Sequence, residues 1–282
     1  MTAATTTMAP SGGAGEAAKR FVRRNGWVLT LWAVLGVMFL ITKLFIKEDY
    51  GAAAVGILVL SALPYAYATA GQTMAIIAGG IDLSMAAMMT LLSVSAAVLM
   101  DGQSEEFGFI AVPLILLLGL AVGSVYGLAV VFTRVPDSVV TLSFFFIWEG
   151  VALLVLEAPG GSISMWLKEL IIGTVGGAFI PDIVSDWAFK ALILLVVTLG
   201  VVWIPLKRSR PGLALYAIGS DKRAAQRSGV PVNRTKVFSY ALAGLFAAMG
   251  GLILTMSTGI GSPVQGPYLL GSVAAAVLGG VS

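Results

Sequence analysis

Long apolar stretches separated by short polar loops dominate the pattern of this chain. A helix needs roughly 20 consecutive apolar residues to cross a bilayer, and seven stretches approach that length. They are predicted at residues 26–45, 52–78, 84–100, 109–133, 139–156, 189–206 and 237–256. An eighth begins near Leu269. The pattern therefore predicts an all-α polytopic membrane protein with about eight transmembrane helices.

Composition agrees with this class and excludes several kinds of chemistry. Hydrophobic residues make up 58% of the chain and charged residues 11%, whereas soluble domains have about 25% charged residues. There is no cysteine and no histidine. Disulfides, thiolate chemistry and catalysis by cysteine or histidine are therefore excluded, and the commonest metal ligand is missing. We expect no catalytic residue, no metal site and no cofactor.

The basic residues predict an orientation. With the N-terminus inside, most of the 17 Lys and Arg fall in inner loops, and Lys43, Lys47, Lys168 and Lys190 fall outside. This distribution follows the positive-inside rule. It also explains the pI of about 9.2 without a nucleic-acid partner. Residues 1–25 are predicted to form a disordered, basic cytoplasmic tail, and residues 26–282 the transmembrane domain.

One apolar stretch is interrupted within its length. Residues 74–91 read MAIIAGGIDLSMAAMMTL, with Gly79-Gly80 followed by Asp82 and Ser84. Unwound backbone at membrane depth is tolerated only where protein buries it or a polar cavity wets it. An acid there indicates a functional site, here a translocation pathway. The other interpretation is that Asp82 or Ser84 caps the next helix while the glycines permit close packing. The two are compatible.

A second acid, Glu149, lies in the predicted span 139–156 beside Trp148. It could line the same conduit or pair with a partner inside the bundle. It could equally lie near an interface and be solvated.

The inner loop 207–236 contains a predicted short helix at 221–228. Ser220 is expected to cap its start, Asp221 suits the positive end of the helix dipole, and Gly229 suits the C-terminal cap. The helix could dock into a cytosolic partner, or it could be a solvated loop helix attracted to anionic lipid. Its remaining distinctive residues are Lys222, Arg223, Ala224, Ala225 and Arg227.

Several motifs together resemble a known family. They are GGIDLS, VPDSVVTLSFFFIWEGVALL, the stretch from AIGSDKRAAQRSGV to AAMGGLIL, and the terminal AAAVLGGVS. They are similar to the permease subunits of ABC importers for ribose, xylose and related monosaccharides. The resemblance runs from about Gly26 to Ser282. One departure is Met85-Ala86, where the family commonly has Val-Gly.

The resemblance implies a type II ABC importer permease in a bacterial inner membrane. It implies a second permease subunit, giving a homodimer, a cytosolic ATP-binding cassette ATPase and a periplasmic sugar-binding protein. The 220–229 helix would be the coupling helix in the ATPase groove. The coupling residues would be Ser220, Asp221, Arg223, Ala224, Ala225, Arg227 and Gly229, and the pathway residues Gly79, Gly80, Asp82, Ser84 and Glu149.

An approximate repeat links the two ends of the chain. AIIAGG at residues 75–80 recurs as AAVLGG at 275–280. Broken segments at corresponding positions of two halves are typical of transporter repeats. Since further spans follow the second copy in the family, the chain is predicted to be incomplete at its C-terminus.

Three functions are open at this stage. An importer permease would rely on a partner for ATP hydrolysis, because the chain has no G-x-x-x-x-G-K-[ST] run. An ion-coupled secondary transporter would use Asp82 and Glu149. A membrane-embedded enzyme would need a catalytic constellation, and the sequence contains none. Which sugar or polyol is moved is not readable from the residues.

Overall fold

The computed structural model describes residues 14–45, 51–175 and 187–281, apart from the side chains of 14–21, 24 and 25. The chain divides into two units, residues 1–50 and 51–282. The first contains one helix, α1 (Ala14–Phe45), whose apolar part Gly26–Phe45 is long enough to span a membrane. The predicted disorder of residues 14–25 was wrong, because this stretch is rich in good helix formers and extends α1. Residues 1–13 of the predicted tail lie outside the described residues.

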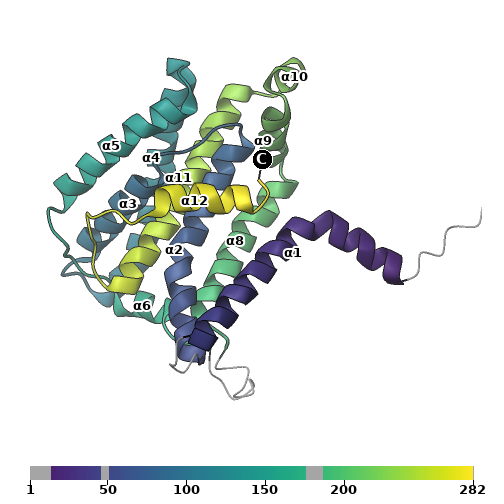
Figure 1. Cartoon of the computed structure of the whole chain (residues 1–282). Helices are drawn as coiled ribbons and strands as arrows, with labels where there is room; N and C mark the ends of the chain where they lie inside the picture. Colours follow the sequence, from purple (N-terminus) through teal and green to yellow (C-terminus); the bar gives the residue numbers. More distant parts are fainter. Residues whose placement is uncertain (1–13, 46–50, 176–186, 282) are drawn as a thin grey trace, which may run out of the picture. The chain divides into compact units, whose positions relative to one another are not determined.

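The second unit is a helical bundle (Figure 1). Its elements are α2 (Ala52–Ile77), α3 (Met85–Met100), the 3₁₀ helix η1 (Glu105–Phe107), α4 (Gly108–Thr133), α5 (Asp137–Val155), α6 (Met165–Ile171), α8 (Lys190–Arg208), α9 (Arg210–Ser220), α10 (Lys222–Arg227), α11 (Val232–Thr258) and α12 (Tyr268–Leu278). Helices α9 and α10 form one end of the unit, and α6 lies at the other (Figure 1).

The predicted all-α membrane class is confirmed. Six helices of the described residues are long and apolar enough to cross a membrane. Two predicted spans are shorter: α3 has 16 residues and α12 has 11. Figure 1 shows α12 lying across α2 and α11 instead of running along them. The count of about eight full spans is therefore not confirmed.

Helices α4 and α11 approach each other so closely that only glycine fits at the crossing. Gly119, Gly123 and Gly127 recur every four residues on α4 and face α11. A Cβ atom at Gly119 would lie 2.5 Å from the carbonyl oxygen of Gly244, and one at Gly244 would overlap the carbonyl oxygen of Gly119. Small residues spaced in this way allow membrane helices to pack backbone to backbone.

Helix α3 lies in the centre of the bundle. Almost all of its side chains are buried, including Met85, Met88 and Met89. It is joined to α11 by a hydrogen bond between the hydroxyls of Ser93 and Thr255, 2.8 Å apart. Because α3 is shielded by neighbouring helices, its apolar sequence reflects burial within protein as much as contact with lipid.

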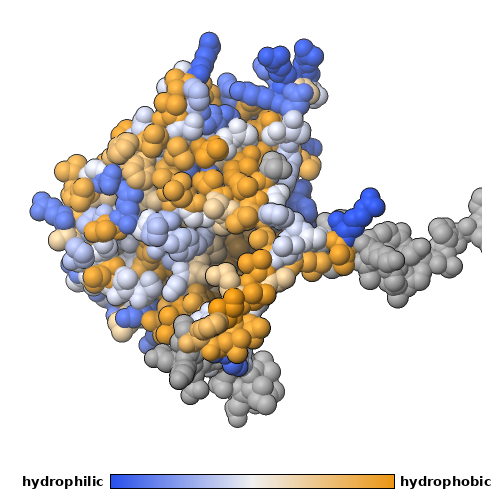
Figure 2. Space-filling view, in the orientation of Figure 1, coloured by the Kyte–Doolittle hydropathy of each residue, from blue (hydrophilic) through white to orange (hydrophobic). Residues whose placement is uncertain are grey.

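The outer surfaces of the long helices are apolar. Leu154 on α5 is 86% exposed and Val201 on α8 is 68% exposed. Figure 2 shows apolar residues over much of the visible face and hydrophilic ones gathered at the end that carries α10. Large apolar side chains left exposed around a bundle are expected where lipid, and not water, is the solvent.

Candidate functional site

The break predicted at Gly79-Gly80 is a closed helix end. Helix α2 stops at Ile77, and Gly79 adopts a left-handed backbone with φ of +77°. The Gly79 N–H donates to the carbonyl of Ile76, and the Gly80 N–H to that of Ala75, both at 2.9 Å. This is the Schellman arrangement, which satisfies the last carbonyls of a helix and favours glycine at the left-handed position.

The second copy of the repeat ends its helix in the same way. After α12, the Gly280 N–H donates to the carbonyl of Val277 at 3.0 Å, and the Val281 N–H to that of Ala276 at 3.2 Å. Here the left-handed residue is Gly280, with φ of +88°, and Gly279 remains right-handed. The two copies thus share the same kind of turn. The left-handed glycine is the first of the pair Gly79-Gly80 and the second of the pair Gly279-Gly280.

Asp82 organises the loop after the break. Its side chain is fully buried. One carboxylate oxygen accepts from the Ser84 N–H at 2.8 Å and from the Ser84 hydroxyl at 2.6 Å. The other accepts from the Tyr126 hydroxyl of α4 at 2.6 Å. Asp82 therefore fixes Ser84, the residue before α3, and ties it to α4, but it accepts no hydrogen bond from an N–H of α3 itself. Ser84 is also buried, and its side chain makes no cap bond to α3.

Two polar residues that the sequence analysis missed hold the loop backbone. The Gln72 amide of α2, turned so that its nitrogen faces the loop, donates to the Asp82 carbonyl at 2.8 Å and accepts from the Asp82 N–H at 3.1 Å. The Thr141 hydroxyl of α5 accepts from the Leu83 N–H at 3.0 Å and donates to the Ile81 carbonyl at 3.2 Å. In the sequence, Gln72 and Thr141 are polar residues within the apolar stretches 52–78 and 139–156, and this is the signal that could have identified them.

An ion pair lies directly against Gly80. Lys236 of α11 and Asp137 of α5 approach to 2.6 Å, with both side chains 14% exposed. The Tyr240 hydroxyl also donates to Asp137, at 2.7 Å. A Cβ atom at Gly80 would overlap the Asp137 carboxylate and lie 2.5 Å from the Tyr240 hydroxyl. Gly80 is therefore required by a close approach between the break and two other helices, which the sequence pattern did not reveal.

Glu149 is not part of this cluster. It lies on α5 eight residues beyond Thr141, about 12 Å along the helix axis at 1.5 Å per residue. It is half-buried, and within the described part of the chain its carboxylate forms no hydrogen bond or ion pair. The neighbouring Trp148 indole N–H is buried without an acceptor. The structure thus separates the two acids that an ion-coupled transporter would use together, and no three acidic side chains among the described residues gather as a metal site would need.

The predicted short helix in the inner loop is present as α10, with one correction. Asp221, not Ser220, is its N-cap: the Asp221 carboxylate accepts from the N–H groups of Arg223 at 2.8 Å and Ala224 at 3.0 Å. Ser220 ends α9, and its hydroxyl donates to the Ala217 carbonyl. Since α9 continues to Ser220, the extended residue between the two helices is Asp221. At the other end of α10, Gly229 has φ of +83° and completes a third Schellman turn.

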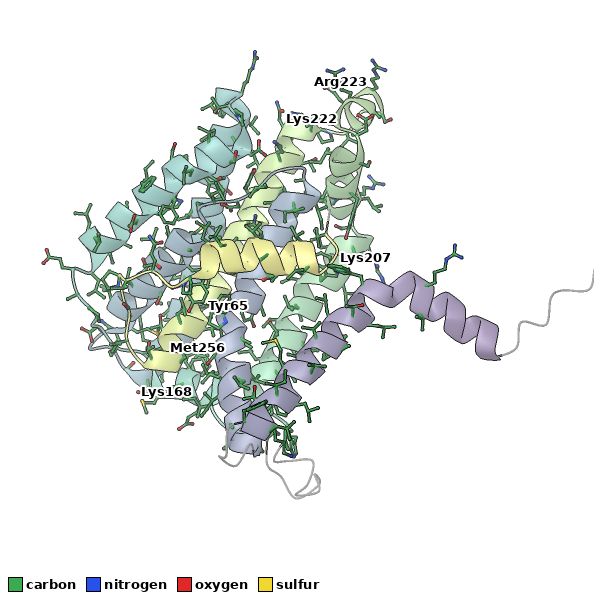
Figure 3. All side chains as sticks on the ribbon, in the orientation of Figure 1. Tyr65, Lys168, Lys207, Lys222, Arg223 and Met256 are labelled. Carbon is green, nitrogen blue, oxygen red and sulfur yellow. The ribbon has the colours of Figure 1, made fainter. Side chains whose placement is uncertain are left out.

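The exposed face of α10 is basic. Ala225 is buried, whereas Ala224, Arg223 and Arg227 are exposed. Figure 3 shows Lys222 and Arg223 at the tip of the unit, pointing away from the bundle. The structure therefore places a capped, cationic helix where a partner could reach it.

Removing the cap should loosen this helix. In Asp221→Ala, two N–H groups of α10 lose their acceptor, and loss of such a cap costs about 1 kcal/mol. We expect about fivefold faster amide exchange at 223–228, measured by hydrogen–deuterium exchange in detergent. Ser220→Ala, which leaves the cap in place, is the control. Equal protection of the segment in wild type and Asp221→Ala would contradict the assigned cap.

Helix α9 links α10 to the break. A Cβ atom at Gly219 would overlap the carbonyl oxygen of Ile77, the last residue of α2. The end of α9, next to α10, thus lies against the last residue of α2, two residues before Gly79.

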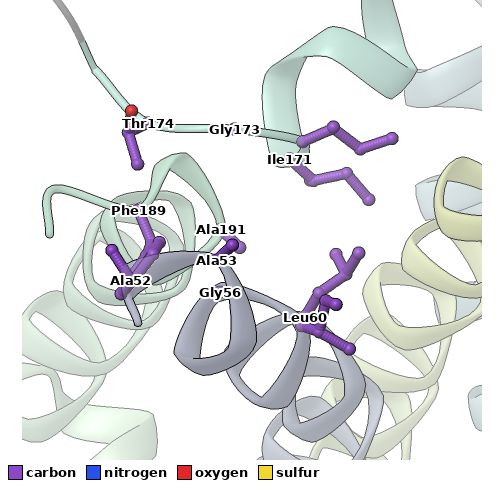
Figure 4. Close-up of a pocket in the computed structure, with 11 residues that line it drawn as sticks. Ala52, Ala53, Gly56, Leu60, Ile171, Gly173, Thr174, Phe189 and Ala191 are labelled. Atoms are coloured by element: carbon purple, nitrogen blue, oxygen red, sulfur yellow. The ribbon is translucent and has the colours of Figure 1, made fainter. Parts of the chain in front are cut away.

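A pocket at the opposite end of the unit is almost wholly apolar. It has a volume of about 350 Å³ and lies between α2, α6 and the start of α8. Figure 4 shows Leu60, Ile171 and Phe189 among its walls, with Thr174 supplying a hydroxyl at the edge. A lining of this kind offers few partners for sugar hydroxyls, so this pocket is not the candidate site.

Comparison with known proteins gives consistent relatives. The ribose import permease protein RbsC of Haemophilus influenzae is 28% identical over 214 residues, 75% of this chain and 64% of the relative. The ribose import permease protein RbsC of Escherichia coli K12 is 30% identical over 214 residues, again 75% of this chain and 64% of the relative. The autoinducer 2 import system permease protein LsrD of Yersinia enterocolitica is 29% identical over 271 residues, 92% of this chain and 77% of the relative.

The chain spans less than two thirds of the length of the ribose permeases it matches. No solved structure matches it significantly. Residues 53–282 match the family model described as branched-chain amino acid transport system, permease component. This match includes the break, the Asp82 network and the α9–α10 element. The chain therefore belongs to this permease family, together with the ribose and autoinducer 2 import permeases of ABC importers.

Proposed function

We propose that this chain is the membrane-spanning permease subunit of an ABC importer that moves a simple sugar. Transport would proceed by alternating access, driven by ATP hydrolysis on a partner subunit. The contact between Gly219 and the end of α2 supports this proposal most directly, because it joins an exposed cytosolic helix to the break in the bundle. The ribose permeases among the relatives support a monosaccharide as the cargo.

The proposal includes three partners. We propose that α10, with Arg223, Ala224 and Arg227 exposed, docks into a groove of a cytosolic ATP-binding cassette ATPase. A second copy of the permease would complete the conduit, and a periplasmic sugar-binding protein would deliver the cargo. We propose that the α10 end lies on the cytoplasmic side of a bacterial inner membrane, with the N-terminus on the same side. The basic residues of the loops at that end support this orientation.

The Asp82 network would keep the break rigid during this motion. Buried hydrogen bonds from Gln72, Tyr126 and Thr141 attach the loop to α2, α4 and α5. The Asp137–Lys236 pair supports Gly80 from the α10 end of the bundle. A loop fixed at several points moves as one piece with its helices, which suits a gate better than an ion-binding site.

Crosslinking tests the proposed partner. The absence of native cysteine allows one thiol to be placed at will. Ala224→Cys, labelled with a thiol-reactive photo-crosslinker and illuminated, should form an adduct with a protein bearing Walker motifs, identified by mass spectrometry of native membranes of the source cells. Ser104→Cys, exposed at the other end of the bundle, is the matched control and should give no such adduct.

Two results would contradict the proposal. One is a maleimide-reactive thiol at position 224 that yields no ATPase adduct in membranes active in uptake. The other is sugar uptake that collapses with an ionophore while cellular ATP is maintained. The second result would favour the ion-coupled alternative.

A further inference from the structure

Two arginines without acidic partners line one cavity at the α10 end of the bundle. The cavity, about 370 Å³, lies between the starts of α9 and α11 and includes Arg210, Arg234 and Phe238 in its lining. No carboxylate lines it. Among the described residues, neither guanidinium forms an ion pair or hydrogen bond. On neighbouring elements, the Asp137 carboxylate is engaged by Lys236 and the Asp221 carboxylate by the N-terminus of α10.

An apolar groove continues from this cavity. It has a volume of about 530 Å³ and runs between α4 and α11. Arg234 and Phe238 line both spaces, so the charged cavity and the groove adjoin. The apolar walls of the groove include Leu128, Val131 and Val237.

The depth of these residues matches the layers of a lipid leaflet. Arg210 opens α9, two residues after the end of the α8 span, and Arg234 is the third residue of the α11 span. Both therefore lie at the level expected for phosphate head groups. Leu128 lies five residues before the end of the α4 span at Thr133, deeper than Arg234 and toward the level of acyl chains.

We propose that this combined groove binds one anionic phospholipid. Its phosphate would lie between Arg210 and Arg234, since planar guanidinium groups suit phosphate oxygens. One acyl chain would follow the groove between α4 and α11. Basic pockets between membrane helices on the cytoplasmic side are typical head-group sites. A bound lipid would join α9 to α11, the helix that carries Lys236 and Tyr240. The proposal does not depend on the cargo or on the ATPase.

Thermal melting of the full chain in detergent tests this site. Added phosphatidylglycerol should raise the melting temperature, and phosphatidylcholine at the same concentration should not. Arg210→Gln combined with Arg234→Gln should weaken the dependence on phosphatidylglycerol about 20- to 30-fold. Arg208→Gln is the matched control, because Arg208 is an exposed arginine of the same boundary and lies outside both linings.

A second variant tests the acyl groove without altering charge. Leu128 is 43% exposed, so Leu128→Trp should fold while filling the groove, and should weaken the lipid effect several-fold. Three results would overturn the proposal. If Arg208→Gln reduces the effect as much as the double variant does, the effect comes from general surface charge. If inorganic phosphate alone reproduces the stabilisation, the cavity is a free phosphate site. If Leu128→Trp changes the oligomeric state while the lipid dependence stays intact, the groove is a protein interface.

Discussion

Replacing Gly244 with alanine is expected to prevent stable assembly of the bundle. The new Cβ atom would overlap the carbonyl oxygen of Gly119 and crowd the backbone of Gly123. These are backbone atoms, so α4 and α11 must separate along the crossing. Overpacking of a tight interface costs about 3 kcal/mol at the upper end of its usual range. This outweighs the roughly 1 kcal/mol by which alanine is the better helix former. The measurement is the yield and melting temperature of the chain purified in detergent.

The matched control is Gly150→Ala. Gly150 also lies within a membrane-spanning helix, α5, but a Cβ atom there meets nothing within 4 Å. The helix propensity of alanine then acts alone, and we expect an unchanged or slightly raised melting temperature. If both variants have the melting temperature of the wild type, α4 and α11 do not approach as closely as described.

Replacing Asp82 with alanine is expected to disorder the loop and stop uptake. The N–H and the hydroxyl of Ser84 would lose their acceptor in a fully buried site, and the Tyr126 hydroxyl would keep only its 3.4 Å contact with the Tyr240 carbonyl. Each buried donor left without a partner costs about 1–3 kcal/mol, so the loss of two such bonds should cost about 2–6 kcal/mol. The measurements are thermal stability in detergent and sugar uptake in cells.

A double-mutant cycle separates the Asp82–Tyr126 contact from general damage. Tyr126→Phe removes one donor and should destabilise less than Asp82→Ala, because Asp82 keeps both bonds from Ser84. The double variant should be more stable than the sum of the single effects indicates, since it leaves no orphaned hydroxyl at position 126. Strict additivity would show that the 2.6 Å hydrogen bond contributes little.

Local chemistry made much of this protein predictable from its sequence. The apolar stretches predicted the long helices, because a bilayer imposes a minimum length on any apolar helix that crosses it. Gly79-Gly80 and Gly229 predicted helix ends, because a left-handed backbone favours glycine. Prediction failed where neighbouring residues competed for one role. Ser220 and Asp221 are both good caps, and the length of α9 decided between them.

The sequence by itself determined the membrane class, the position of the break and the basic helix after it. Only the tertiary structure decided what the break contacts. Gln72, Tyr126 and Thr141 meet Asp82 and its loop from three helices far apart in the chain. Gly80 meets the Asp137–Lys236 pair, and Gly219 meets the end of α2. Long apolar helices carry little information about which of their faces meet, because most of their residues suit either protein or lipid. The meeting of these helices, through small residues and a few buried polar groups, creates the site.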